Sequence, residues 1–443
     1  MSPTAASDAF RSVFRRNLAA NFVAQVWGVV LNLAFIPVFL HLLGPEQYGL
    51  IAFGISLQAV LAVLDLGLAT TANREFSRAR AGAPGVASGP VMLRTLEVIY
   101  FSMGALVAAS LILMAPWVAD HWLQAESISR ETVRNSLALL GLATGLRWPV
   151  AVYSGVLLGL ERQVSLNLVM MVRSALRTAG AAGALMLAGG TVEAYFAWLV
   201  VVSIVELGAT GWLAWRSQPE KVREPARFDR AVLRSFWNFS GELTLVSIFA
   251  AVLKQEDKFV IARLAPLAAL GHYNVAATLS GGLLLFSTPV FTAVFPRLSA
   301  MLARDDQAGA AAVYHRASGL VAMLVAPAAA ALMLFPQPLL AAWTRSPAVV
   351  AEATGPLVVL AFAMLLNASM QVPYALLLAA GLTRISLWIN GLGVAILAPL
   401  LVVFVRLYGI VGAGVAWAVF NLAYFIIAPI LLHRRALRGH LRQ

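Results

Sequence analysis

The sequence predicts an all-α, polytopic membrane protein in which twelve transmembrane helices form two six-helix lobes around a central cavity. Two observations carry this prediction. Hydrophobic residues make up 60% of the 443 residues and the mean hydropathy is +0.82, so the chain has too little polar surface for a soluble globule. Apolar runs of about 20 residues, the length that spans a bilayer as a helix, recur along the whole chain.

Each apolar run predicts one helix. The expected helices lie at residues 17–41, 47–72, 93–118, 135–158, 165–187, 193–215, 236–262, 269–295, 315–335, 353–378, 385–405 and 409–432. The longest polar stretch near the middle of the chain separates the sixth run from the seventh. We therefore expect an N-lobe at residues 1–215, a cytoplasmic interlobe linker at 216–234, and a C-lobe with a basic cytoplasmic tail at 235–443.

The distribution of basic residues predicts the orientation of the chain. If the N-terminus is cytoplasmic, most of the 32 lysine and arginine residues fall in links on the cytoplasmic side. The links expected outside contain only Arg130, Arg134, Arg263, Arg345 and Arg406. Because cytoplasmic loops carry the excess of Lys and Arg, both termini are expected in the cytoplasm. Topology thus accounts for the net charge of +12, and no nucleic-acid partner is expected. Residues 1–16 lack the pattern of a cleaved signal peptide, so we expect the first helix to be retained.

A weak internal repeat relates the first hairpin of each lobe. The first copy reads Leu-Gly-Pro-Glu-Gln-Tyr-Gly at residues 43–49, and the second, at residues 264–273, places Pro266 before Gly271 and Tyr273. Both copies have a proline turn, then a glycine near a tyrosine, then an apolar helix. Such repeats are typical of secondary transporters.

Several local motifs carry a family resemblance. They are the hairpin at residues 43–49, Leu-Asp-Leu-Gly-Leu at 64–68, Asn73-Arg74, Asp-Lys-Phe-Val-Ile at 257–261 and Leu-Gly-His-Tyr at 270–273. Together they resemble bacterial polysaccharide and O-antigen flippases of the multidrug/oligosaccharidyl-lipid/polysaccharide exporter superfamily. The second hairpin matches less closely, because Ala265 and Ala269 stand where glycine and glutamate are more usual.

The resemblance implies a function. A member of this family would move a polyprenyl-pyrophosphate-linked glycan from the cytoplasmic to the periplasmic leaflet of the bacterial inner membrane, by alternating access, for O-antigen or exopolysaccharide biosynthesis. Its partners would be this glycan, the lipid bilayer and other polysaccharide assembly proteins. A multidrug or cation antiporter of the same superfamily is an alternative, and an integral-membrane glycan polymerase or ligase is another.

Three arginines are expected near mid-bilayer, where an anionic cargo would need them. Arg147 lies in the fourth expected helix, and Arg173 and Arg177 lie in the fifth, four residues apart. Residues four apart share one face of a helix, so these two guanidinium groups are candidates to chelate a diphosphate together. The alternative is that Glu206, at similar depth in the sixth helix, neutralises one arginine in a static pair. Even with that pair formed, three arginines and one acid leave a net positive charge.

A charged cluster, Lys-Gln-Glu-Asp-Lys at residues 254–258, interrupts the seventh apolar run. Lys254 and Lys258 are also four apart, so they are candidate substrate-binding cations on one face. At about 1.5 Å per residue from the start of the helix, the cluster falls in the outer third of the span. It would then line an outward-facing vestibule or gate, or else be a solvated cluster at headgroup level.

Acidic residues within the apolar runs are candidates for coupling transport to a proton or sodium gradient. They are Glu206, Glu242 and Asp257. Intramembrane carboxylates commonly mark ion pathways, and the alternative for each of these is a satisfied structural group. A polar stripe on the first helix, comprising Asn21, Gln25, Gly28 and Asn32, either meets sugar hydroxyls or holds helices together.

The sequence argues against an enzyme. It has no cysteine, and it contains no HExxH, Walker or Gly-rich dinucleotide motif. The longest outside link, at residues 117–134, contributes acids and a histidine without metal-ligand spacing. No cofactor or metal is therefore expected. A cation antiporter would need an acid-lined cavity, so the arginines favour an anionic cargo.

Overall fold

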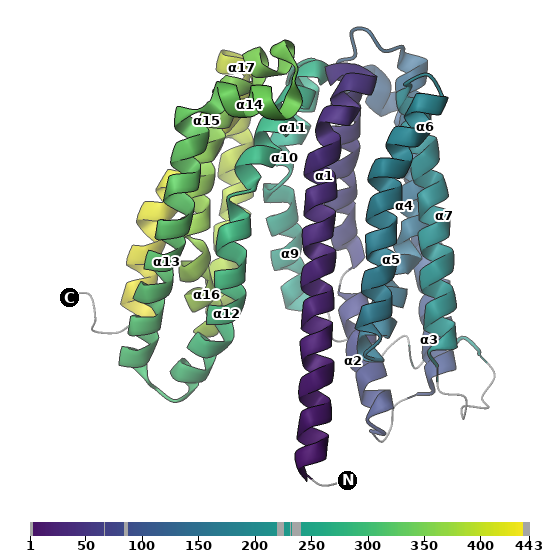
Figure 1. Ribbon diagram of the computed structural model, residues 1–443, viewed down its shortest axis with the longest axis vertical. Coiled ribbons are helices and arrows are strands. Elements are labelled where there is room, and N and C mark those ends of the chain that lie inside the picture. The colour runs from purple at the N-terminus through teal and green to yellow at the C-terminus, as the bar shows by residue number, and fades with distance from the viewer. Residues whose placement is uncertain are drawn as a thin grey trace. The chain divides into compact units, whose positions relative to one another are not determined.

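The computed structural model describes the backbone of residues 3–65, 67–83, 87–218, 226–230, 232 and 241–436. Apart from short connections and one isolated bridge between Gln124 and Pro266, these residues are helical (Figure 1). Eight of the described helices are long and apolar enough to cross a membrane, judged by length and composition. The chain is thus an all-α, multi-pass membrane protein, as the sequence predicts.

The first group of helices runs to residue 216. It comprises α1 (Pro3–Leu61), a 3-10 turn (Ala62–Asp65), α2 (Leu68–Arg80), α3 (Gly89–His121), α4 (Arg130–Gly159), α5 (Gln163–Ala175), a π-helical turn (Leu176–Gly180), α6 (Ala181–Leu187) and α7 (Val192–Arg216). The second group comprises α9 (Gly241–Leu253), α10 (Glu256–Leu264), α11 (Leu267–Gly281), α12 (Leu284–Ala303), α13 (Gln307–Leu334), α14 (Pro336–Thr344), α15 (Pro347–Ser369), α16 (Gln371–Ala379) and α17 (Thr383–Ala436).

Two pairs of expected helices follow each other directly and are bent at a non-helical glycine. α1 contains Gly44 at φ 76° and ψ 170°, and α17 contains Gly409 at φ 59° and ψ −142°. Only glycine adopts such positive φ values readily, so each serves as the corner between two spans. The halves of α1 and α17 correspond to the helices expected at residues 17–41, 47–72, 385–405 and 409–432.

Other expected helices are broken, which the apolar pattern did not predict. The second ends at Leu61 and resumes as α2 after Gly67, whose φ is 75°. The seventh breaks at Lys254 and Gln255, where the charged cluster begins. The tenth breaks before Pro373, which has no backbone N–H to continue the hydrogen-bond ladder. Hydropathy averaged over the length of a span does not report these local breaks.

Packing divides the chain into two units. Unit 1 comprises residues 1–44, 61–122 and 127–244, and unit 2 comprises residues 45–60, 123–126 and 245–443. Unit 2 therefore includes residues 45–60, the second half of α1, from the N-terminal part of the sequence. The lobe boundaries expected from sequence stay a prediction, since most of the linker at 216–234 lies outside the described residues.

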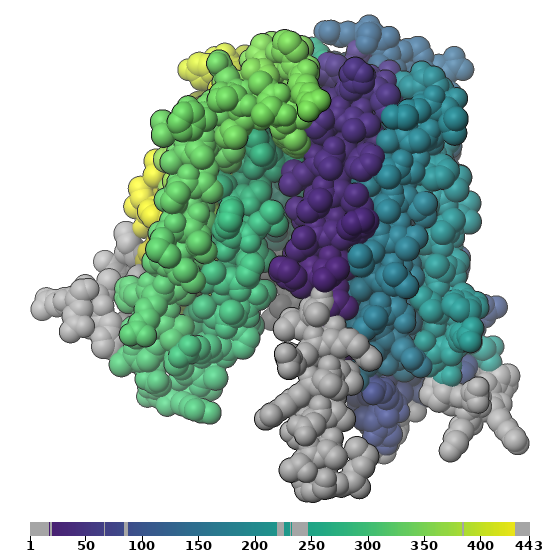
Figure 2. Space-filling view, in the orientation of Figure 1, coloured from purple at the N-terminus to yellow at the C-terminus, as the bar shows by residue number. Residues whose placement is uncertain are grey.

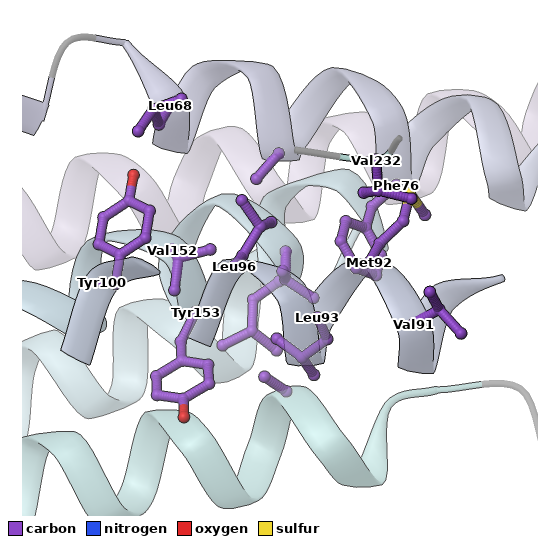
Figure 3. Packing of buried hydrophobic residues seen from close by; sticks show 14 of the residues in the cluster. Leu68, Phe76, Val91, Met92, Leu93, Leu96, Tyr100, Val152, Tyr153 and Val232 are labelled. Atoms are coloured by element: carbon purple, nitrogen blue, oxygen red, sulfur yellow. The ribbon is translucent and has the colours of Figure 1, made fainter. Parts of the chain in front are cut away.

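The core of unit 1 lies where α2, α3 and α4 pack together. Its buried side chains include Leu68, Phe76, Met92, Leu93, Leu96, Tyr100, Val152 and Tyr153 (Figure 3). Tyr100 and Tyr153 direct their hydroxyl groups to opposite sides of this cluster (Figure 3). The Tyr100 hydroxyl donates to Asp65, and the Tyr153 hydroxyl donates to the buried Glu97 at 2.7 Å. Polar groups at the margin of the core are thereby satisfied, as burial requires.

The core of unit 2 is built mainly by α12, α13, α15 and α16. Fully buried small residues such as Ala310, Ala329, Ala361 and Ala375 allow these helices to approach closely. On the face of unit 2 seen in Figure 2, α12 and α13 form much of the green surface. These two helices expose apolar side chains, namely Leu285, Phe286, Leu320, Met323 and Leu324. An exposed apolar surface of this kind suits contact with lipid.

Candidate functional site

An ion cluster lies within the membrane-spanning helices of unit 1. Glu206, near the middle of α7, is only 5% exposed. One of its carboxylate oxygens, Oε2, lies 3.3 Å from Nε of Arg147 on α4, and the other, Oε1, lies 3.4 Å from Nε of Arg173 on α5. A single buried carboxylate therefore bridges two arginines on two other helices. Pairing of Glu206 with one arginine is one of the alternatives drawn from the sequence, and the structure shows ion pairs with two.

Arg177 extends this cluster. It lies in the π-helical turn at Leu176–Gly180, and its charge is close enough to interact with that of Arg147. π-helical turns are rare in proteins, but those that occur are often found at functional sites. The structure thus brings the three arginines into one electrostatic group, in which Glu206 contacts Arg147 and Arg173 and Arg177 interacts with Arg147. Within these four side chains the positive charges outnumber the negative by two.

The arginines lie nearer to the surface of unit 1 than the acid that holds them. The side chains of Arg147 and Arg173 are 29% and 22% exposed, against 5% for Glu206. Arg173 and Glu206 also line a cavity of about 230 Å³, whose other lining residues are apolar. The Nε atoms of both arginines are buried and face Glu206, so the N–H donors that remain for a ligand are those of the terminal guanidinium nitrogens. The cluster can therefore offer charge and N–H donors to an anion.

A second group surrounds the break between α9 and α10 in unit 2. Asp257 is 4% exposed and accepts hydrogen bonds from the Tyr273 hydroxyl at 2.7 Å and from the Lys258 backbone N–H at 2.8 Å. The Lys258 ammonium lies 3.3 Å from the same carboxylate. Lys258 is thus paired locally, whereas Lys254 is exposed and has no ion pair or side-chain hydrogen bond among the described residues. The two lysines, which the sequence predicts to lie on one helix face as candidate substrate-binding cations, therefore differ in whether they are paired.

Lys254, Lys258 and Asp257 line a cavity of about 450 Å³ inside unit 2. Polar side chains in its wall are Gln255, Ser280, Asn367, Gln371 and Asn390, and aromatic ones are Tyr374, Trp417, Phe420 and Tyr424. Sequence reasoning missed these residues of α15, α16 and α17. A signal was present, because residues 367, 371 and 374 and residues 417, 420 and 424 are spaced three and four apart, as on one helix face.

Two other sequence expectations concern single residues. Glu242 falls in α9, but its side chain lies outside the described residues. Asn21, in the polar stripe of α1, accepts a hydrogen bond from Asn167 on α5 at 2.5 Å. For Asn21 the structure therefore shows a contact that holds two helices together, one of the two alternatives drawn from the sequence.

Comparison with known proteins gives matches along nearly the whole chain. A family model described as polysaccharide biosynthesis protein matches residues 14–302, and the MatE family model matches residues 243–404. A putative O-antigen transporter of Shigella flexneri is 20% identical over 377 residues, which are 85% of this chain and 87% of that protein.

Solved structures show the same fold. The lipid II flippase MurJ, in an inward closed conformation, has a TM-score of 0.72 at 12% identity, with 94% of this chain and 86% of that chain covered. A multidrug resistance MATE family transporter of the MOP superfamily, inward facing, has a TM-score of 0.71 at 14% identity, with 93% and 96% covered.

Proposed function

Because the chain belongs to the polysaccharide biosynthesis protein family, whose relatives are transporters and not enzymes, we propose that it is a flippase for a polyprenyl-pyrophosphate-linked oligosaccharide. The lipid-linked glycan moves from the cytoplasmic to the periplasmic leaflet of the bacterial inner membrane and serves surface polysaccharide biosynthesis, as O-antigen or exopolysaccharide. Both termini are cytoplasmic. Movement follows alternating access, and other polysaccharide assembly proteins act on the cargo before and after transport. The similarity to a putative O-antigen transporter supports this assignment.

The observation that carries the proposal is the excess of positive charge around Glu206. Moving a pyrophosphate through hydrocarbon requires fixed cationic partners, and guanidinium groups suit it because they donate in a planar, forked arrangement. Arg147, Arg173 and Arg177 supply these groups. Glu206 holds Arg147 and Arg173 close together despite their mutual repulsion, so the pair is already in place when the anion arrives.

Lys254 and Lys258 are the proposed substrate contacts in unit 2. Lys254 is the more available of the two, because Lys258 is paired with Asp257. Ion coupling to a proton or sodium gradient is assigned to Glu206, Glu242 or Asp257. Glu206 in this role would release an arginine whenever it took up a cation, which would link ion binding to cargo binding directly.

A multidrug or cation antiporter is the second candidate function. The match of the MatE model to residues 243–404 favours it. The charge of the unit 1 cluster opposes it, because a cationic drug would be repelled by three arginines facing one acid. A glycan polymerase or ligase has no comparable support.

The test of the proposal removes the three arginines one at a time. Arg147→Ala, Arg173→Ala and Arg177→Ala should each abolish surface polysaccharide and cause the lipid-linked precursor to accumulate at the cytoplasmic face, with membrane levels of the protein unchanged. Arg216→Ala, at the exposed end of α7, is the matched control and should retain export. Normal surface polysaccharide in all three variants would refute the binding role of the cluster.

A further inference from the structure

We propose that the 450 Å³ cavity of unit 2 is a saccharide-binding subsite that holds sugar residues of the cargo. This inference rests on the proposed function and adds to it, because it assigns the glycan to unit 2 and leaves the pyrophosphate to the arginines of unit 1. The volume falls within the roughly 300–1,000 Å³ that is usual for small-molecule pockets. The chemistry of the wall then decides which kind of ligand it fits.

The aromatic side chains of the wall suit the apolar C–H faces of pyranose rings. Tyr374, Trp417, Phe420 and Tyr424 all line the cavity. Ring contacts hold three of them: Trp417 meets Phe420 edge to face at 6.2 Å, and Tyr374 stacks on Phe291 at 6.1 Å. Large rings held in this way present flat apolar surface with little conformational freedom left to lose on binding.

Two amides of the wall are held by hydrogen bonds that use their N–H groups. The Asn367 amide donates to Asn421 Oδ1 at 2.9 Å, and Asn421 donates in turn to the Trp417 carbonyl at 2.9 Å. The Asn390 amide donates to the Ser386 carbonyl at 2.9 Å. Each bond anchors its side chain and leaves the side-chain carbonyl oxygen as an acceptor. Asn367 and Asn390 are therefore preorganised acceptors.

Three other polar side chains of the wall retain their full hydrogen-bonding capacity. Lys254, Gln255 and Gln371 make no side-chain hydrogen bond or ion pair among the described residues. The ammonium of Lys254 can only donate, whereas the two glutamines can donate and accept. Together with Asn367 and Asn390 they match a polyol, because every sugar hydroxyl both donates and accepts.

The same lining disfavours the other ligands that an aromatic cavity takes. An organic cation would meet Lys254 and Lys258, while the carboxylate of Asp257 is already occupied by Tyr273 and Lys258. A metal ion is disfavoured because no group of three or more acidic, histidine or cysteine ligands occurs in the described part of the chain. A pyrophosphate would find only one unpaired cation there. Sugar hydroxyls satisfy the amides without bringing an opposing charge.

The experiment measures binding of the delipidated glycan to the full-length protein in lipid nanodiscs. The probe is the glycan released by mild acid from the lipid-linked pool of a strain that lacks this protein. Isothermal titration measures its affinity, and saturation-transfer NMR identifies the sugar protons in contact. Inorganic pyrophosphate is titrated in parallel.

Gln371→Ala should weaken glycan binding about tenfold, the usual effect of losing one or two hydrogen bonds. Gln371→Leu preserves the volume of the side chain and should have the same effect, which separates lost hydrogen bonding from misfolding. Both variants should bind pyrophosphate like wild type, and Gln337→Ala, an exposed glutamine of α14, should bind the glycan like wild type. Arg147→Ala should bind the delipidated glycan normally but lose pyrophosphate.

Two results would overturn the subsite. One is a glycan that binds both Gln371 variants as tightly as wild type, and the other is a glycan that does not bind the wild-type protein. Either result leaves the proposed function standing if the arginine variants still block export. If export persists in all three arginine variants, the binding role proposed for the unit 1 cluster fails, which is a separate outcome.

Discussion

Gly49 and Gly271 make a reciprocal contact in unit 2. A Cβ atom at Gly49 would overlap the carbonyl oxygen of Leu267, and one at Gly271 would overlap the carbonyl oxygen of Pro45. The two glycines come from the two hairpins that the sequence predicts to be repeats. The helix that begins at Pro45 and α11 thus cross at equivalent points, with backbone against backbone.

Substitution at this crossing should destabilise the protein. Gly49→Ala and Gly271→Ala each place a methyl group against a backbone carbonyl, which cannot move aside as a side chain can. Overpacking of this kind costs about 1–3 kcal/mol, so the thermal unfolding temperature in detergent should fall. Gly319→Ala in α13 is the control, because a Cβ there has nothing within 4 Å and should leave the unfolding temperature unchanged or slightly raised. Equal effects at all three positions would show that the close crossing is not the cause.

Removing the acid of the arginine cluster should cost more than removing an exposed acid. Glu206→Gln leaves Arg147 and Arg173 facing each other without a counter-charge, and loss of one partner of a buried pair typically costs about 3–5 kcal/mol. The partial exposure of both arginines should reduce this value. Thermal unfolding of the purified protein measures the effect, with Glu131→Gln in the exposed first turn of α4 as control.

The double variant Glu206→Gln/Arg147→Gln supplies a stricter check on the cluster. If the ion pair is real, the two changes are not additive, and the double variant is more stable than the sum of the single effects implies. Strict additivity would contradict an energetic coupling between Glu206 and Arg147.

Tyr273 should stabilise unit 2 through its hydroxyl. The side chain is fully buried and donates to the buried Asp257, so Tyr273→Phe leaves a carboxylate oxygen without one of its donors. Such a loss costs about 1–3 kcal/mol. Tyr408→Phe is the matched control, because Tyr408 is 61% exposed. We expect the melting temperature to fall for Tyr273→Phe and not for Tyr408→Phe. Equal melting temperatures for the two variants would contradict a stabilising role of the Tyr273 hydroxyl.

The absence of native cysteine makes the predicted orientation directly testable. Ser127→Cys lies in an exposed link expected in the periplasm, and Ala308→Cys lies in the exposed first turn of α13, expected in the cytoplasm. In intact cells whose outer membrane has been permeabilised, an impermeant maleimide should label the first variant alone. Labelling of Ala308→Cys but not Ser127→Cys would reverse the orientation.

The sequence predicts the order and rough extent of the helices, because a helix that spans the bilayer needs an apolar run of a set length, and hydropathy detects such runs. It also offers an ion pair between Glu206 and an arginine as one of two alternatives, since charges of opposite sign at equal depth have few other partners. It does not predict the break at Lys254 or the π-turn at Arg177, which depend on local backbone hydrogen bonding. The wall of the unit 2 cavity was missed because residues as far apart in sequence as Gln371 and Trp417 come to line one cavity only through tertiary packing.

The placement of residues 45–60 in unit 2 bears on how the protein is made. This segment leaves the ribosome long before residue 245, where the main part of its unit begins. It must therefore remain in the membrane without its final neighbours while α3 to α7 are inserted. Separate production of the two sequence halves would deprive unit 2 of this segment. We therefore expect a complete unit 2 only when both halves of the sequence are made in the same cell.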